Sequence, residues 1–196
     1  MLGQTFDFTY GYKTVLDANA QQYVVGTQNV QIYNEGTPGA SYWAPSTTGT
    51  VGILTSEFTF AEPTSEIFVN AQLASFNFGG GTYGYGSLYG STDGSTWTLL
   101  LDSPTPSTPG NYVFYNQDVP NEFLGTTSFW LQERLTAYGS PIMAQFSHFG
   151  QGNSFNGFEL DAKYAATPEP SSSALLALSL FVLASFRKFY RKAHAP

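Results

Sequence analysis

Hydrophobic and polar residues alternate with a period of two along most of the first 166 residues, which is typical of half-buried β-strands. Near the N-terminus, Phe6, Phe8, Tyr10 and Tyr12 fall on one face of an extended segment. No segment before residue 170 has the 3.6-residue period of an amphipathic helix. The pattern predicts strands at 5–12, 22–25, 29–33, 50–60, 66–78, 85–90, 95–101, 111–116, 127–138, 143–149 and 157–164.

Turn-forming residues separate the predicted strands. Clusters of Gly, Pro, Asn, Asp and Ser at 34–36, 92–95 and 102–110 favour turns and surface loops. Short strands at this spacing predict an all-β fold, an antiparallel β-sandwich or jelly roll, in one domain over residues 1–166. The sequence has no internal repeat, which argues against a propeller or a solenoid.

The C-terminal segment has a different pattern. Residues 174–186 are apolar apart from two serines and carry no charge. As a helix with its flanking residues, 174–190 approaches the roughly 20 residues that a bilayer requires. The basic residues that follow are expected to stay cytoplasmic, and they are Arg187, Lys188, Arg191 and Lys192. We therefore expect a Pro/Ser-rich linker over 167–173 and a transmembrane helix with a basic tail over 174–196. An amphipathic or buried helix is the weaker alternative, because the apolar run has no polar face.

The order of these parts resembles the PEP-CTERM sorting signal of exported bacterial proteins. Pro168, Glu169 and Pro170 precede the serines, the apolar helix and the basic cluster, so the resemblance covers 167–192. It implies recognition by an exosortase-type membrane enzyme, cleavage near Glu169, and delivery to the cell surface or the exopolysaccharide matrix. The same terminal element is found on some ice-binding proteins. The body has no regularly spaced threonine array, so an ice-binding function rests on the tail alone.

The N-terminus lacks the features of a secretory signal peptide. Residues 1–8 have no basic start and no apolar run of 7–15 residues. An exported protein needs such a segment, so we expect the signal peptide to be missing from this sequence. A tail-anchored protein with a cytoplasmic body is the alternative.

Composition narrows the classes of function. Among the 196 residues, 17% are aromatic and 11% charged, and the net charge is −7. Residues 1–166 hold three basic and 13 acidic residues, a net charge of −10, so we expect no nucleic-acid binding. The absence of cysteine excludes disulfides and thiolate metal sites. With two histidines, His148 and His194, a His-rich metal site is also excluded. We expect no cofactor, and no motif supports a structural Ca²⁺ ion.

One hairpin resembles those of galactose-binding-like jelly rolls. Residues 88–100 place Asp93 and Gly94 in a turn, and Trp97 follows on the returning strand. Residues 158–164 also resemble the final strand of these domains. The resemblance implies a fold whose members often bind glycans through loops at one end.

Two aromatic segments are candidates for glycan contact. Residues 79–86 contain five glycines with Tyr83 and Tyr85, and we expect a loop whose rings stack on the apolar faces of sugars. Trp43, beside Tyr42, is the second candidate. The alternative for the first segment is a flexible loop whose tyrosines fold back on the sandwich.

Few side chains are candidates for other chemistry. Glu159 and Asp161 face one side of a strand and could serve acid–base catalysis or hold Ca²⁺, although a solvated outer face is favoured. Glu133 and Arg134 are adjacent and therefore face opposite sides, and we expect Arg134 to form a cross-strand salt bridge, with a ligand contact as the weaker alternative. We expect His148 to be hydrogen-bonded within its strand.

The sequence thus favours a non-enzymatic surface or matrix protein that binds extracellular polysaccharide or acts in adhesion. A structural matrix protein without a small ligand is the first alternative. A polysaccharide hydrolase that uses Glu133 or Glu159 is the second.

Overall fold

The computed structural model describes residues 5–11, 22–34, 41–107, 109–146 and 157–164. Within these ranges the chain forms twelve β-strands, and every strand pair is antiparallel. Two short 3-10 helices complete the described part, η1 (Asn121–Phe123) and η2 (Pro141–Met143).

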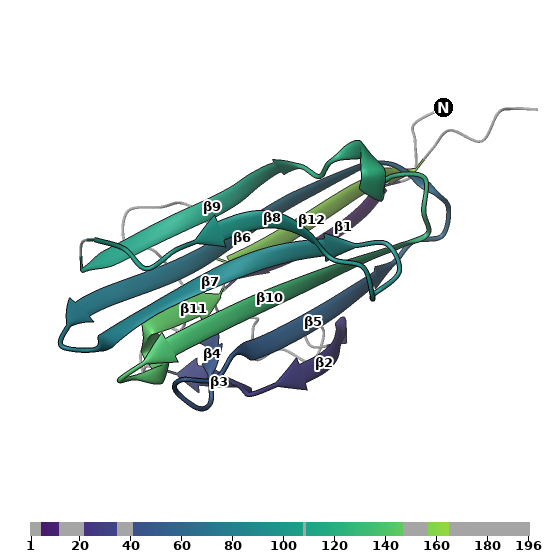
Figure 1. Ribbon diagram of the computed structural model, residues 1–196. Helices are drawn as coiled ribbons and strands as arrows, with labels where there is room; N and C mark the ends of the chain where they lie inside the picture. Colours follow the sequence, from purple (N-terminus) through teal and green to yellow (C-terminus); the bar gives the residue numbers. More distant parts are fainter. Residues whose placement is uncertain (1–4, 12–21, 35–40, 108, 147–156, 165–196) are drawn as a thin grey trace, which may run out of the picture. The chain divides into compact units, whose positions relative to one another are not determined.

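The strands form two layers, which we call sheet A and sheet B (Figure 1). Sheet B contains, in spatial order, β2 (Val24–Gln28), β5 (Gly52–Thr59), β10 (Ser128–Tyr138), β7 (Thr82–Ser91) and β8 (Thr98–Ser103). Its central strand, β10, is therefore paired on both sides, with β5 and with β7.

Sheet A is built around β6 (Thr64–Gly79), which is 16 residues long. One side of β6 pairs with β9 (Gly110–Asp118). The other side pairs first with β12 (Gly157–Tyr164) and then with β11 (Ala144–Phe146). The layer is extended by β1 (Thr5–Gly11) on β12, and by β4 (Ser41–Pro45) and β3 (Val30–Asn34) on β11. The last residues of β6 also pair with β7, so hydrogen bonding continues from one layer into the other.

The inward side chains of the two layers form one hydrophobic core. Leu54, Leu88 and Leu131 from sheet B are no more than 1% exposed. Val69 and Leu73 from sheet A are fully buried in the same cluster. The all-β antiparallel sandwich expected from the sequence is confirmed for the described residues.

Most predicted strands are present with ends shifted by a few residues, and two local expectations need correction. The five-residue strand β4 was not among the predicted strands. The expected loop 79–86 is wrong in extent, because only Gly79–Gly81 form the turn and β7 begins at Thr82. These three glycines have positive φ angles of 74°, 58° and 84°, a conformation that favours glycine.

The turn between β7 and β8 is organised by Asp93, as expected. Its Oδ1 accepts hydrogen bonds from the backbone N–H groups of Thr96 (2.7 Å) and Ser95 (2.8 Å). These bonds hold the pKa of the Asp93 carboxyl well below its usual range. Gly94 adopts a φ of 69°, which a side chain would disfavour.

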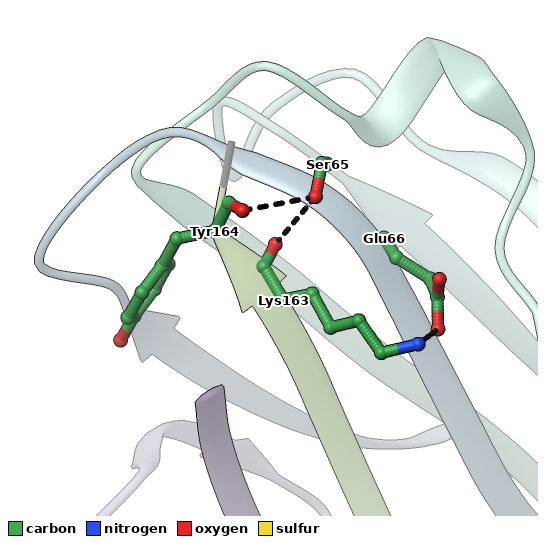
Figure 2. Close-up of polar contacts among 4 residues, drawn as sticks. All are labelled: Ser65, Glu66, Lys163 and Tyr164. Carbon is green, nitrogen blue, oxygen red and sulfur yellow. Dashed lines mark hydrogen bonds and ion pairs between the residues drawn. The ribbon is translucent and has the colours of Figure 1, made fainter. Parts of the chain in front are cut away.

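The end of β12 is fixed to the start of β6 by polar contacts (Figure 2). The Ser65 hydroxyl donates to the carbonyl oxygens of Lys163 (3.2 Å) and Tyr164 (3.1 Å), where the strand register shifts. The Lys163 ammonium forms an ion pair with Glu66 (2.5 Å), and this contact raises the pKa of Lys163. The close-up shows Ser65 placed between the two carbonyls, so it satisfies backbone groups at the irregularity.

Several sequence predictions fall outside the described residues. They include His148, the side chain of Glu159, the linker 167–173 and the predicted transmembrane segment 174–196 with its sorting signal. Among the residues that are described, no helix has the length and apolarity needed to cross a membrane. The sorting signal and the domain boundary at residue 166 stay predictions.

Candidate functional site

Strand β7 carries three tyrosines and Ser87 on its outer side, and three glycines and Leu88 on its inner side. Tyr83, Tyr85 and Tyr89 are partly exposed, whereas Gly84 and Gly86 are buried. A Cβ atom on Gly84 would lie 2.3 Å from the carbonyl oxygen of Met143, and one on Gly86 would lie 2.9 Å from a Leu135 methyl group. The core thus packs directly against the inner side of the β7 backbone, and the rings are left on the outside.

The neighbouring strand β10 contributes outward residues to the same surface. In the antiparallel register Tyr138 lies opposite Tyr83, and Thr136 lies opposite Tyr85. The Tyr83 and Tyr138 rings are stacked, with centroids 4.7 Å apart and planes inclined by 26°. A hydrogen bond with Tyr85 raises the pKa of Tyr138 and links the phenol groups. We call this surface the tyrosine face, defined by Tyr83, Tyr85, Tyr89, Arg134 and Tyr138.

Arg134 is held in one orientation on this face. Its Nε donates a hydrogen bond to the side-chain oxygen of Gln132 (2.7 Å). The guanidinium carbon lies 4.1 Å from the centroid of the Tyr89 ring, which is cation–π geometry. Gln132 is fixed in turn by donating to the hydroxyl of Thr55 on β5 (3.1 Å). The chain of contacts crosses all three central strands of sheet B.

The salt bridge expected for Arg134 is not found among the described residues, where the ion pair present joins Lys163 and Glu66. The expectation that Glu133 and Arg134 face opposite sides is confirmed. Arg134 is partly exposed, whereas Glu133 is 1% exposed.

Glu133 lies in the core of the sandwich, not on the surface. Its strand neighbours are Leu54 on β5 and Leu88 on β7, both buried. Burial raises the pKa of the Glu133 carboxyl to about 8, and its Oε2 atom has no hydrogen-bond partner in the described part of the chain. The group is therefore protonated at neutral pH and out of reach of a polysaccharide chain.

The other candidate residues, Trp43 and Asp161, lie away from the tyrosine face. Trp43 belongs to the hydrophobic core and is 8% exposed, because β4 pairs it with the buried Phe146 of β11. It presents no open ring face here, while Tyr83 and Tyr85 do lie on an outer surface. Asp161 is half-buried on β12 and Leu160 points inward, as expected. Within the described ranges no group of three or more acidic or histidine side chains is arranged to hold a metal ion.

Sequence analysis missed Tyr89, Tyr138 and Gln132 as members of the site. The outward direction of Tyr89 and Tyr138 follows from the period of two in 85–90 and 127–138, whereas Gln132, on the same side of β10, is 9% exposed. That Tyr138 lies beside Tyr83, and Gln132 beside Tyr89, depends on the pairing of β7 with β10, which are separated by two other strands in sequence. The missing information was the strand pairing, not the character of the residues.

Comparison with known proteins finds solved structures that are similar to this chain only at low sequence identity. No family model and no curated protein matches the chain. The CBM22-1 xylan-binding domain from Paenibacillus barcinonensis is 9% identical with a TM-score of 0.44, over 84% of this chain and 97% of that one. A CBM6 domain from Zobellia galactanivorans is 11% identical with a TM-score of 0.39, over 82% and 100%. CBM27-1 from Caldicellulosiruptor saccharolyticus, solved with mannohexaose, is 11% identical with a TM-score of 0.35, over 81% and 95%. These scores are too low to assign a function, so the site is judged from its own residues.

Proposed function

We propose that this chain is an exported, non-enzymatic β-sandwich that binds polysaccharide on the tyrosine face. The observation that carries the proposal is the stacked pair Tyr83 and Tyr138, with Tyr85 beside it, on the outer side of two adjacent strands. Because these residues lie on paired strands, their positions are fixed before a ligand arrives. Such preorganisation lowers the entropic cost of binding.

The chemistry of the face suits sugars. A sugar ring has an apolar side of C–H groups and a rim of hydroxyl groups. The aromatic plane of tyrosine can pack against the C–H side, and its phenol can hydrogen-bond to the hydroxyl groups. The guanidinium of Arg134 adds a polar group in a fixed orientation, because the buried Gln132 accepts its Nε–H.

The position of Glu133 argues against hydrolysis at this surface. Glycosidases need a pair of carboxyl groups on either side of the scissile bond. Glu133 points into the core, so it cannot form such a pair on the tyrosine face. The non-enzymatic part of the proposal rests on this placement.

The export part of the proposal is supported by the sequence of 167–192 alone. Its PEP motif, apolar segment and basic cluster follow one another as in exosortase substrates. The acidic body, nearly free of lysine and arginine, accords with an extracellular protein that must stay soluble.

Binding of the purified full chain to a panel of immobilised bacterial and plant polysaccharides tests the proposal. We expect Tyr83→Ala and Tyr138→Ala each to weaken binding by at least about tenfold, which corresponds to about 1.4 kcal/mol. Tyr33→Ala is the matched control, because Tyr33 is an exposed tyrosine of sheet A (37% exposed) that stacks on Tyr42. Equal losses in all three variants, or no binding to any polysaccharide, would refute the proposal and favour a structural matrix protein.

A further inference from the structure

Arg134 occupies the middle of the tyrosine face. On β10 it lies opposite Ser87 of β7 and opposite Ile53 of β5. It is separated from Tyr138 by four residues of the same strand, or about 13 Å along the sheet. A polysaccharide that stacks one sugar on Tyr138 and follows β10 therefore reaches Arg134 within a few sugar units.

The guanidinium is immobilised but its outer edge is open. A guanidinium carries five N–H donors. The Nε–H is used by Gln132, and one face of the group is covered by the Tyr89 ring. The four N–H donors on the two Nη atoms have no hydrogen-bond partner within the described residues. The site thus presents the part of arginine that binds carboxylates in bidentate fashion.

The nearby acids do not neutralise Arg134. Asp102 on β8 accepts a hydrogen bond from Ser87 (2.9 Å), and Glu57 on β5 lies opposite Trp130. Neither forms an ion pair with Arg134 in the described structure, where Lys163 and Glu66 make the ion pair. A cation fixed in this way on a binding surface is complementary to an anionic group of the ligand.

From this geometry we infer that the tyrosine face binds an acidic polysaccharide, with a uronic acid carboxylate on the Nη atoms of Arg134. The inference rests on the proposed function and names its ligand class. Bidentate pairing gives short, charge-assisted hydrogen bonds at a defined angle. At physiological ionic strength the Debye length is about 8 Å, so more distant acids of the body oppose the contact only weakly.

The experiment measures binding of the full chain to alginate, polygalacturonate and hyaluronate, and to each polymer after its carboxylates have been reduced to alcohols. We expect at least one native polymer to bind at least about tenfold more tightly than its reduced form. We expect Arg134→Met to abolish this difference and Arg134→Lys to restore part of it, because lysine keeps the charge but loses the planar fork.

Two further variants sharpen the test. Lys163→Met removes a positive charge on β12, away from the tyrosine face, and should leave binding unchanged. Asp102→Asn removes a negative charge beside the site and should strengthen binding to the acidic polymer only. Circular dichroism of every variant checks that the sandwich is intact.

The outcomes separate the two proposals. Binding that depends on Tyr83 but favours neutral polymers, or that survives Arg134→Met, overturns the acidic-ligand inference and leaves the proposed function standing. Absence of binding to all polymers, neutral and acidic, overturns both.

Discussion

Two neighbouring side chains at the centre of β10, Glu133 and Arg134, face opposite environments. The strand alternation directs the carboxyl into the core and the guanidinium onto the tyrosine face. Burial keeps the carboxyl protonated, whereas stacking on Tyr89 and a hydrogen bond to Gln132 fix the orientation of the guanidinium. Although the two residues are adjacent, Glu133 therefore affects the stability of the fold and Arg134 affects the chemistry of the surface.

Glu133 should make the stability of the protein fall as the pH rises. Its pKa in the folded state is about 8, above the ordinary value of 4.5, so the folded protein retains a proton that the unfolded chain releases. Stability is therefore greatest below the ordinary pKa and declines with rising pH until about pH 8. Urea unfolding at pH 5, 6.5 and 8 should show this decline in the parent protein and a much smaller one in Glu133→Gln.

The exposed Glu62 supplies the control for this measurement. Glu62→Gln removes a carboxyl group from the surface without altering the core, so the decline with pH should persist. A parent-like decline in Glu133→Gln would show that another group causes it.

At the scale of the element, β7 is shaped by its glycines. A Cβ atom on Gly84 would lie 2.3 Å from the backbone of η2, and one on Gly90 would lie 3.0 Å from the ring of Phe123 in η1. Glycine in a strand usually weakens it, and here the absence of a side chain permits the two 3-10 helices to pack against β7. The alternation of glycine with tyrosine is therefore a packing requirement and not a sign of a flexible loop.

Gly84→Ala should destabilise the sandwich. The new methyl group would lie 2.3 Å from a backbone oxygen, and backbone cannot move aside as a flexible side chain does. Overpacking of this kind costs about 1–3 kcal/mol. Gly26→Ala on β2 is the control, since its Cβ would lie 3.8 Å from the nearest atom. In thermal and chemical unfolding, the stability of Gly84→Ala should be well below that of Gly26→Ala. Equal stabilities would contradict this packing of β7.

The alternating pattern was sufficient to predict most of the strands, because a period of two is a local property of the sequence. It failed for β4, where residues 42–45 are all buried and hydrophobic and polar positions do not alternate. The local sequence around Trp43 therefore gives no sign that this ring is buried, as it is where β4 pairs with β11.

The candidate site was predictable only in part for the same reason. Aromatic residues among glycines indicate Tyr83 and Tyr85 as candidates. No local pattern indicates that Tyr138 stacks on Tyr83. The role of Arg134 also depends on its contacts with Gln132 and Tyr89, which come from two different strands. The site is assembled by strand pairing between segments far apart in the sequence. Such pairing leaves no signal in the local sequence pattern.

At the scale of the molecule, the proposed sorting step removes none of the described structure. The last described strand, β12, ends at Tyr164 and is fixed to β6 through Ser65. Cleavage near the PEP motif at 168–170 therefore leaves every described strand in place. The released protein would keep its tyrosine face and lose the basic cluster.

Mass spectrometry of the protein from a native or exosortase-bearing host should find a mature C-terminus between residues 167 and 170. Replacing Glu169 with alanine should retain the tail and keep the protein with the membrane fraction. The processed and full-length forms should unfold at the same temperature, because the described strands are shared. An intact C-terminus on a cytoplasmic body would refute the sorting proposal.

The separation of glycines and tyrosines on β7 has an evolutionary consequence. The inner positions are the closely packed Gly84, Gly86 and Gly90 and the fully buried Leu88, so selection for folding acts on them almost alone. The outer positions 83, 85, 87 and 89 are partly exposed, and substitutions there can alter ligand preference at little cost to stability. A lineage of such proteins could therefore diversify its specificity by exchanging outer residues while one unchanging set of glycines preserves the scaffold.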